Sequence, residues 1–221
     1  MTLDQQAQEW RGNIYALIGF AYYQRPSRTF LQGLAANDPF SLSVFPEIDD
    51  RVTEGLRLLS ASLKPFRQGV PDDDLERVQW DYTRMFTGPG MPKAPPWESY
   101  YRTEERIVFS RYTLEVRACY ERFGLVSEHK DHEPDDHIGL ELEFMAHLCD
   151  RCMEALREGD RRAAVTTLDA QREFLDHHLL LWAPLFCRDV CNNAESDFFL
   201  GMARLTEGFL DGDREFLEAE G

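Results

Sequence analysis

Apolar residues recur every three or four positions through almost the whole chain. The first such segment stops at Pro26 and carries Leu3, Ala7, Trp10, Ile14, Leu17, Ile18 and Ala21 on one face. This spacing is typical of an amphipathic α-helix. No segment of useful length alternates apolar and polar residues as a half-buried strand does, and no internal repeat is present. We therefore predict an all-α fold, a single globular multi-helix bundle with a hinge loop before the C-terminal helices.

Helix start and stop signals divide the rest of the chain. Ser27 is a typical N-cap, three acids at Asp72 to Asp74 suit a helix N-terminus, and Gly124 is a typical helix end. The further helices that we expect run from Ser27 through Leu34, from Ile48 to Leu63, from Asp72 through Phe86, from about Thr103 to Phe123, from Glu133 and Pro134 to Gly159, from Arg161 to Cys191 with a break or kink at Pro184, and from Phe199 to Phe209.

A length of 221 residues allows one domain with a sizeable core or two small lobes. We expect one domain over residues 1–221, which can be divided into an N-lobe at 1–124, a hinge at 125–133 and a C-lobe at 134–221. Exchange of the C-terminal helices at such a hinge is one route to a dimer, so a monomer and a domain-swapped dimer both stay open.

The chain carries a net charge of −16. This argues against nucleic acid as a partner, because binding to phosphates relies on Lys and Arg. No apolar run reaches the roughly 20 residues of a membrane span, and the polar N-terminus lacks the positive segment of a signal peptide. We expect a cytoplasmic protein.

Five cysteines are present, among them the pair Cys149 and Cys152 and the pair Cys187 and Cys191. These spacings could supply four thiolates to zinc, but both pairs fall in helical segments, where they share a face. We interpret them as buried reduced thiols.

Signatures of catalysis are mostly missing. The chain has no G-x-S-x-G motif, no lysine after a glycine as in a phosphate-binding loop, and no Glu-x-x-His pair as in di-iron bundles. The alternative that remains is a metal-dependent helical-bundle enzyme that uses a cluster of imidazoles and carboxylates in residues 129–147. Its candidate ligands are His129, Asp131, His132, Asp135, Asp136, His137, Glu143 and His147.

Two stretches instead indicate a recognition site. A proline-rich loop from Gly88 to Pro96 leads into an aromatic cluster from Trp97 to Tyr101, and acids crowd the turn from Glu133 to His137. Carboxylates can bind guanidinium groups through paired hydrogen bonds, while aromatic rings cover apolar side chains. We attribute Glu133 and Pro134 to the start of a helix and assign a binding role to Asp135, Asp136 and His137.

Both stretches resemble signatures of the TorD/DmsD/NarJ family of redox-enzyme maturation chaperones. The first is Tyr82-Thr83-Arg84-Met85-Phe86-Thr87-Gly88-Pro89 followed by Pro95-Pro96-Trp97-Glu98-Ser99-Tyr100. The second runs Glu133-Pro134-Asp135-Asp136-His137-Ile138-Gly139-Leu140-Glu141-Leu142-Glu143-Phe144-Met145, and His178 with Trp182 resembles a third, weaker block. Trp97 stands where Tyr is commoner in the family.

The resemblance implies an all-helical cytoplasmic chaperone without catalytic turnover and without a cofactor of its own, although weak GTP binding is associated with the family. Its partners would be the twin-arginine leader and the mature part of a molybdopterin-containing oxidoreductase, which it would hold for cofactor insertion and proofreading before Tat export. The implied peptide-binding residues are Trp80, Tyr82, Phe86, Pro95, Pro96, Trp97, Glu98, Ser99, Tyr100, Glu133, Asp135, Asp136 and His137.

Overall fold

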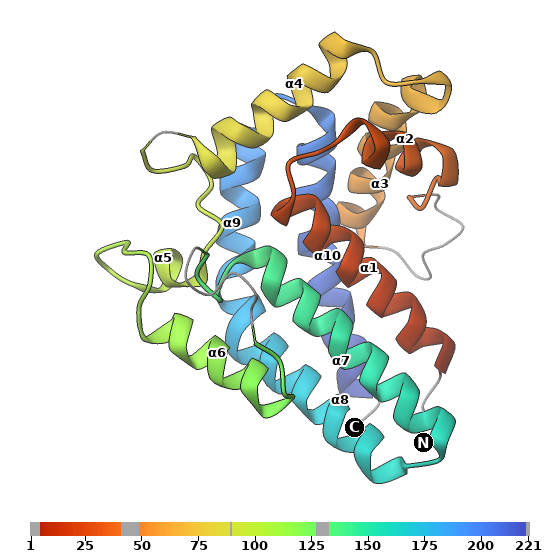
Figure 1. The fold of residues 1–221 in the computed structure, drawn as a ribbon, viewed down its shortest axis with the longest axis vertical. Helices are drawn as coiled ribbons and strands as arrows, with labels where there is room; N and C mark the ends of the chain where they lie inside the picture. Colours follow the sequence, from red (N-terminus) through yellow and green to blue (C-terminus); the bar gives the residue numbers. More distant parts are fainter. Residues whose placement is uncertain (1–4, 41–48, 89, 127–132, 220–221) are drawn as a thin grey trace. The chain divides into compact units, whose positions relative to one another are not determined.

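The computed structural model of the chain describes residues 5–40, 49–88, 90–126 and 133–219 (Figure 1). Within these ranges all regular secondary structure is helical, apart from one isolated bridge, so the predicted all-α class is confirmed. No helix in the described part of the chain is both long and apolar enough to cross a membrane.

The helices follow one another as α1 (Gln5–Tyr23), α2 (Arg28–Asn37), α3 (Asp50–Leu63), α4 (Asp72–Tyr82), α5 (Glu98–Arg102), α6 (Arg111–Arg122), α7 (Ile138–Glu158), α8 (Arg161–Phe174), α9 (Leu180–Asn193) and α10 (Asp197–Ala219). A 3₁₀ turn, η2 (Lys64–Gln68), extends α3. Two π-helical turns, η3 (Thr83–Thr87) and η4 (Leu175–Leu179), follow α4 and α8.

The chain forms two compact units. The first is drawn from residues 1–23, 96–183 and 210–221, and the second from residues 24–95 and 184–209. Each unit therefore combines segments that are far apart in the sequence. The division at a hinge over residues 125–133 stays a prediction, since residues 127–132 lie outside the described part of the chain.

In the first unit, α1 packs closely against α7 because glycines lie where the two backbones meet. A Cβ added to Gly139 would lie 2.6 Å from Tyr23 Cβ and 2.9 Å from the carbonyl oxygen of Gly19. A Cβ added to Gly19 would lie 2.9 Å from the carbonyl oxygen of Gly139. The close approach of these helices thus depends on the absence of side chains at both positions.

A buried ion pair joins α1 to the end of α10 in the same unit. Arg11 and Asp213 form two hydrogen bonds, and the side chain of each is 1% exposed. The Tyr15 hydroxyl donates to Asp213 Oδ2 at 2.7 Å, and Arg11 Nη1 donates to Gln8 Oε1 at 2.9 Å. These bonds offset part of the desolvation of the two charges, so removal of either partner would leave a buried charge unpaired.

The second unit has an aromatic core that includes two of the predicted peptide-binding residues. Tyr82 and Phe86 are buried and contact Phe199, with ring centroids 6.0 Å and 5.4 Å away. Asp81 accepts hydrogen bonds from the amide and the hydroxyl of Ser196 at 2.9 Å and 2.7 Å. Its carboxylate therefore caps the start of α10 from another segment of the unit.

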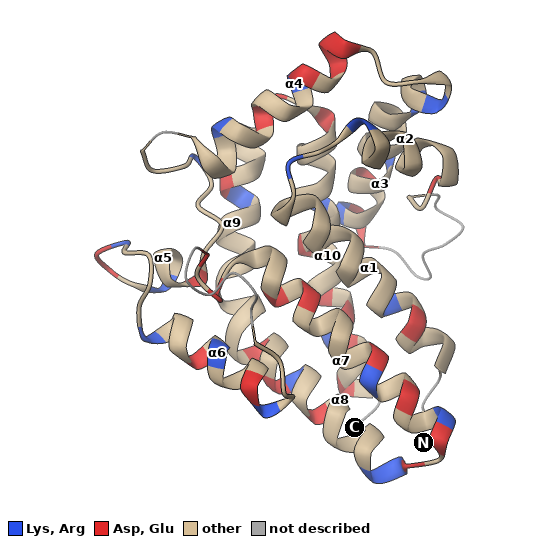
Figure 2. Ribbon diagram, in the orientation of Figure 1, with Lys and Arg blue, Asp and Glu red and all other residues tan. Residues whose placement is uncertain are grey.

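Most predicted helix ends are close to the observed ones. The Ser27 hydroxyl accepts from Phe30 N at the start of α2, and Gly159 adopts the left-handed conformation at the end of α7. Asp72, Asp73 and Asp74 form the first turn of α4, where the acids gather in Figure 2. They complement the helix dipole, as predicted, although no side chain forms a cap hydrogen bond there.

The helix predicted from Thr103 is wrong over residues 103–110, because α6 begins only at Arg111. Thr103 Oγ1 accepts a hydrogen bond from Ile107 N, and Arg106 and Phe109 have positive φ angles of 52° and 69°. Local hydrogen bonds between a side chain and the backbone compete with helix formation. The spacing of apolar residues does not reveal this competition, so the sequence pattern predicted a helix here.

The predicted helix start at Glu133 and Pro134 is also wrong. The helix α7 begins at Ile138, with His137 as its N-cap. His137 Nδ1 accepts a hydrogen bond from Gly139 N at 3.0 Å, whereas the carbonyl of Pro134 accepts from His137 N at 3.3 Å in the preceding turn. The acids of residues 133–136 therefore precede the helix and are available for other contacts.

Candidate functional site

The two signature stretches pair with each other through their backbones in the first unit. Trp97 and His137 form an isolated antiparallel bridge. Glu98 N donates to Asp136 O at 3.0 Å, and Ile138 N donates to Pro96 O at 2.8 Å. Stretches that lie about forty positions apart in the sequence thus make one local structure.

Side chains of the acidic stretch reinforce this pairing. Glu133 Oε1 accepts from Trp97 Nε1 at 2.6 Å, and Asp136 Oδ2 accepts from Ser99 N at 2.7 Å. Ser99 lies in the first turn of α5, whose N-cap residue supplies no side-chain hydrogen bond, so Asp136 caps this helix from the other stretch. Burial raises the pKa of Asp136, although the bonds to Ser99 oppose this effect.

Asp135 connects the same stretch to α6. Its carboxylate accepts from Arg117 Nε and pairs with Arg117 Nη2, both at 2.7 Å. Its carbonyl oxygen accepts from the Tyr120 hydroxyl at 2.9 Å. Asp135 and Asp136 are 1% and 0% exposed, so their described contacts lie inside the protein.

His137 is buried among rings and is neutral. Its ring lies edge-on to Tyr23 and Trp97, with centroids 5.2 Å and 6.3 Å away. Burial lowers the pKa of His137 to about 3. A neutral ring agrees with the cap geometry, because Nδ1 must be unprotonated to accept the Gly139 amide.

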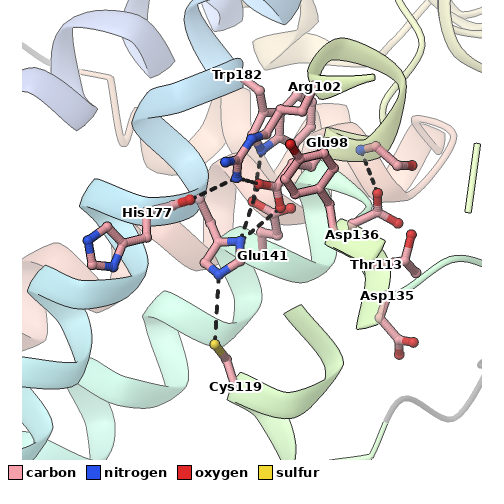
Figure 3. A network of polar contacts seen from close by, with 12 residues as sticks. Glu98, Arg102, Thr113, Cys119, Asp135, Asp136, Glu141, His177 and Trp182 are labelled. Atoms are coloured by element: carbon pink, nitrogen blue, oxygen red, sulfur yellow. Dashed lines mark hydrogen bonds and ion pairs between the residues drawn. The ribbon is translucent and has the colours of Figure 1, made fainter. Parts of the chain in front are cut away.

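Glu98 is the centre of a buried polar network (Figure 3). Arg102 binds the Glu98 carboxylate one turn further along α5 and also donates to the carbonyl of His177 at 2.9 Å. The imidazole Nδ1 of His178 lies 2.9 Å from Glu98 Oε2. Both histidines lie in the π turn η4, whose irregular backbone brings a carbonyl and an imidazole to the same glutamate–arginine pair.

Glu141 extends the network from α7. Trp182 Nε1 donates to Glu141 Oε2 at 3.0 Å. Burial, followed by the nearby Glu98 carboxylate, raises the pKa of Glu141 well above its ordinary range. Its Oε1 has no ordinary hydrogen-bond partner, while Glu98 lies within hydrogen-bonding reach. A protonated Glu141 that donates to Glu98 accounts for both observations.

The surface beside this network is apolar and was missed from the sequence. Ile107 and Phe109, in the loop between α5 and α6, are 48% and 51% exposed, and Leu114 on α6 is 51% exposed. Trp97 and Tyr100 are partly exposed. Phe109 also has a positive φ of 69°, a conformation that is strained for a bulky residue and that concentrates at functional sites.

The remaining predicted residues divide between the surface and the interior. Pro96, Glu98 and Ser99 are buried in the first unit, whereas Glu133 is partly exposed. In the second unit, described by itself, Trp80 is 65% exposed, and Tyr82, Phe86 and Pro95 are buried. The structure brings Pro96 to Tyr100 together with Glu133 to His137. Their role in peptide binding stays a prediction.

The described residues contain no group of three or more His, Cys, Asp or Glu side chains arranged to hold a metal ion. His129, Asp131 and His132 lie outside the described part of the chain. All five cysteines are free. The prediction of buried thiols is confirmed for Cys149, Cys152 and Cys187 and is wrong for Cys191, which is partly exposed.

Comparisons with known proteins identify the family of the chain. A model of the nitrate reductase delta subunit family matches residues 46–188, a range that contains both signature stretches and η4. This match assigns the all-helical chain, with its two paired signature stretches, to a known protein family. The chain belongs to the nitrate reductase delta subunit family.

Individual relatives carry chaperone names. A protein named "Chaperone protein TorD" from Vibrio cholerae is 27% identical over 89% of this chain and 81% of its own length. A protein of the same name from Aliivibrio fischeri is 27% identical over 87% of this chain and 82% of its own. "Probable Tat proofreading chaperone DmsD" from Haemophilus influenzae is 28% identical over 59% and 57%. These relatives are named as chaperones and not as enzymes.

Proposed function

We propose that this protein is a cytoplasmic maturation chaperone that binds the twin-arginine leader and the mature part of a molybdopterin-containing oxidoreductase. The observation that carries the proposal is the backbone pairing of the two signature stretches at Trp97 and His137, beside an exposed apolar surface. Membership of a family with relatives named TorD and DmsD supports the chaperone role. The protein would hold the client for cofactor insertion and proofreading before export, without catalytic turnover.

In this proposal the predicted peptide-binding residues contribute in two ways. Trp97, Tyr100 and Glu133, which are partly exposed, contact the leader directly, and Trp80 offers a further exposed ring in the second unit. Within each unit, the buried residues hold the exposed residues of that same unit in place, because their polar atoms bind within the unit or their rings form its core. This supporting set consists of Tyr82, Phe86, Pro95, Pro96, Glu98, Ser99, Asp135, Asp136 and His137.

The apolar part of the leader would bind Ile107, Phe109 and Leu114. Full burial of an aliphatic or aromatic side chain contributes about 1.5–3 kcal/mol, so three side chains that become partly buried on binding can support specific peptide binding.

The positive charge of the leader would be attracted by exposed acids in the same region, Glu104, Glu105 and Glu115. Acidic residues lie at the tip of the loop between α5 and α6 in Figure 2, next to a basic residue of the same loop. The net charge of −16 adds long-range attraction for a basic peptide.

Titration calorimetry with a synthetic twin-arginine leader tests this assignment. We expect Ile107→Ser to weaken binding about tenfold, which corresponds to ~1.4 kcal/mol. Phe20→Ser is the matched control, because Phe20 on α1 is also 48% exposed. A peptide with both arginines replaced by lysine should bind more weakly, since lysine cannot form paired hydrogen bonds with a carboxylate. Equal affinities of Ile107→Ser, Phe20→Ser and the native chain for the leader would show that Ile107, Phe109 and Leu114 do not form the binding surface.

The alternative is a metal-dependent helical-bundle enzyme that uses residues 129–147. Elemental analysis of protein purified without added metal distinguishes this enzyme from the proposed chaperone. Stoichiometric metal would favour the enzyme.

Two further predictions stay open to test. They are the weak GTP binding implied by the family resemblance, and the choice between a monomer and a domain-swapped dimer. Equilibrium dialysis with GTP and sizing chromatography over a range of concentrations test them.

A further inference from the structure

We propose that Cys119 is a thiol-modification site that undergoes exchange with low-molecular-weight disulfides, because its sulfur ends a Cys–His–Glu arrangement. Cys119 Sγ on α6 lies 3.8 Å from His178 Nε2. The other ring nitrogen of His178, Nδ1, lies 2.9 Å from Glu98 Oε2. A nucleophile, an imidazole and a carboxylate that orients the imidazole form the arrangement that activates cysteines for reaction.

The imidazole is held in place from several sides. Its ring stacks on Phe174, with centroids 4.8 Å apart and an angle of 26° between the planes. Glu98 is in turn bound by Arg102 and lies within reach of Glu141 on α7. Since Glu98 is 0% exposed and His178 is 6% exposed, water does not compete effectively for these contacts.

The charge state of His178 is set by its burial and by its two partners, Cys119 and Glu98. Burial lowers the pKa of His178, but the hydrogen bonds to Cys119 and Glu98 outweigh it and raise the pKa to about 9. The ring is therefore protonated at neutral pH and presents an N–H to the sulfur. Other ionisable groups near the sulfur are Tyr120 and Arg122 on α6, and Arg122 pairs with Glu173 at 2.9 Å. Cationic neighbours stabilise a thiolate, which is the reactive form of cysteine.

Exposure distinguishes Cys119 from the other thiols. Cys149, Cys152 and Cys187 are 0% exposed, and burial raises their pKa values, to about 12 for Cys149 and about 11 for Cys152. Cys191 is partly exposed like Cys119, but burial raises its pKa and no imidazole contributes to the shift. Cys119 is the thiol that combines partial exposure with an imidazolium neighbour.

The reaction balances as ordinary thiol–disulfide exchange. The Cys119 thiolate attacks one sulfur of a small disulfide, a new S–S bond forms to the protein, and the old S–S bond breaks. The second half of the disulfide leaves as a thiolate that takes up one proton, so cysteine sulfur is oxidised while the reagent is reduced. Formation of the adduct would break the contact between Cys119 and His178. Because His178 also binds Glu98, the modification would alter the hydrogen bonding of a residue in the candidate site.

The test measures the rate at which each thiol of the full native chain reacts with 4,4′-dithiodipyridine and with glutathione disulfide between pH 5.5 and 8.5. The adducts are located by peptide mass spectrometry. We expect Cys119 to react at least about tenfold faster than Cys191 at pH 6.5, because burial raises the pKa of Cys191 despite the nearby Arg204 and no imidazole offsets this effect. In His178→Gln the Cys119 rate should fall about tenfold at this pH, while Cys191 in the same molecules serves as the control for folding.

Glu98→Gln gives a second variant that keeps the shape of the side chain and removes its charge. It should slow Cys119 at pH 6.5 and shift the rate profile to higher pH. Equal rates for Cys119 and Cys191 in the native chain would overturn the proposal. So would an unchanged Cys119 rate in both variants.

Discussion

His137 illustrates how one buried side chain makes stability depend on pH. It caps α7 through Nδ1, and its pKa is lowered by burial from an ordinary value of 6.5 to about 3. Between these two values the unfolded chain binds a proton that the folded protein does not. The stabilisation is therefore complete above pH 6.5 and is lost progressively as the pH falls toward 3.

His137→Asn tests this linkage, because Asn is also a good N-cap and does not titrate. The native chain should lose about 2 kcal/mol between pH 7 and pH 5 through His137, and the variant should lack this loss. Urea unfolding at the two pH values measures the difference. If both proteins lose the same free energy of unfolding, His137 does not titrate as its burial indicates.

Glu141 produces the opposite dependence. A carboxyl whose pKa is raised on folding stabilises the protein fully below its unfolded pKa near 4.5, and this stabilisation is lost as the pH rises toward the folded pKa. Glu141→Gln can still accept from Trp182 Nε1 and can donate to Glu98 without titration. The free energy of unfolding of the variant, relative to the native chain, should therefore be higher at pH 8 than at pH 5. A constant difference across this range would show that Glu141 is ionised in the fold.

At the scale of single elements, the contact between α1 and α7 depends on Gly139. Gly139→Ala would introduce a Cβ 2.6 Å from Tyr23 Cβ and 2.9 Å from a backbone oxygen, so the helices must separate. We expect a loss of about 1–3 kcal/mol, as for other overpacked cores. Thermal or urea unfolding measures it.

Gly33→Ala in α2 is the matched control, since nothing lies within 4 Å of a Cβ added there. It should stabilise the protein by roughly 0.5–1 kcal/mol, because alanine is the better helix former. Equal effects of the two substitutions would mean that helix propensity, and not the approach of α1 to α7, decides the result.

The elements that could be predicted from sequence are those in which apolar spacing and caps agree. The helix α2 carries both signals, with Ser27 as the predicted and observed N-cap, whereas α3 was identified from its apolar spacing alone. The segment of residues 103–110 and the start of α7 were assigned wrongly. The side chains of Thr103, Ser110 and His137 accept hydrogen bonds from nearby backbone amides, and these bonds decide where the helices begin. Such bonds depend on rotamers and on residues distant in sequence, which apolar spacing does not record.

The candidate site was predictable only in part for a similar reason. The two signatures marked Trp97 and His137, but their bridge depends on tertiary contact. The contribution of His178 depends on the π turn η4, which has no recognised spacing signal in sequence. Likewise, the exposure of Ile107 and Phe109 follows from a loop that was predicted to be helix.

At the scale of the whole molecule, an acidic chain with a chaperone family assignment and a small exposed apolar surface fits a protein that binds a basic and apolar peptide. In the proposed complex, charge would attract the leader over distance, whereas apolar contacts would slow its dissociation. We therefore expect high salt to lower the association rate several-fold, with a smaller effect on dissociation. Stopped-flow fluorescence of a labelled leader peptide at two ionic strengths measures both rates, and an equal effect on the two would contradict this division.

The most direct test of the chaperone assignment is affinity capture of the native chain from its own host, followed by mass spectrometry of the bound proteins. We expect enrichment of a molybdopterin-containing oxidoreductase that still carries its twin-arginine leader, and loss of that enrichment when the leader arginines are replaced by lysine. Capture of the oxidoreductase only in its mature, leaderless form, or no enrichment of any such enzyme over a control bait, would contradict the account.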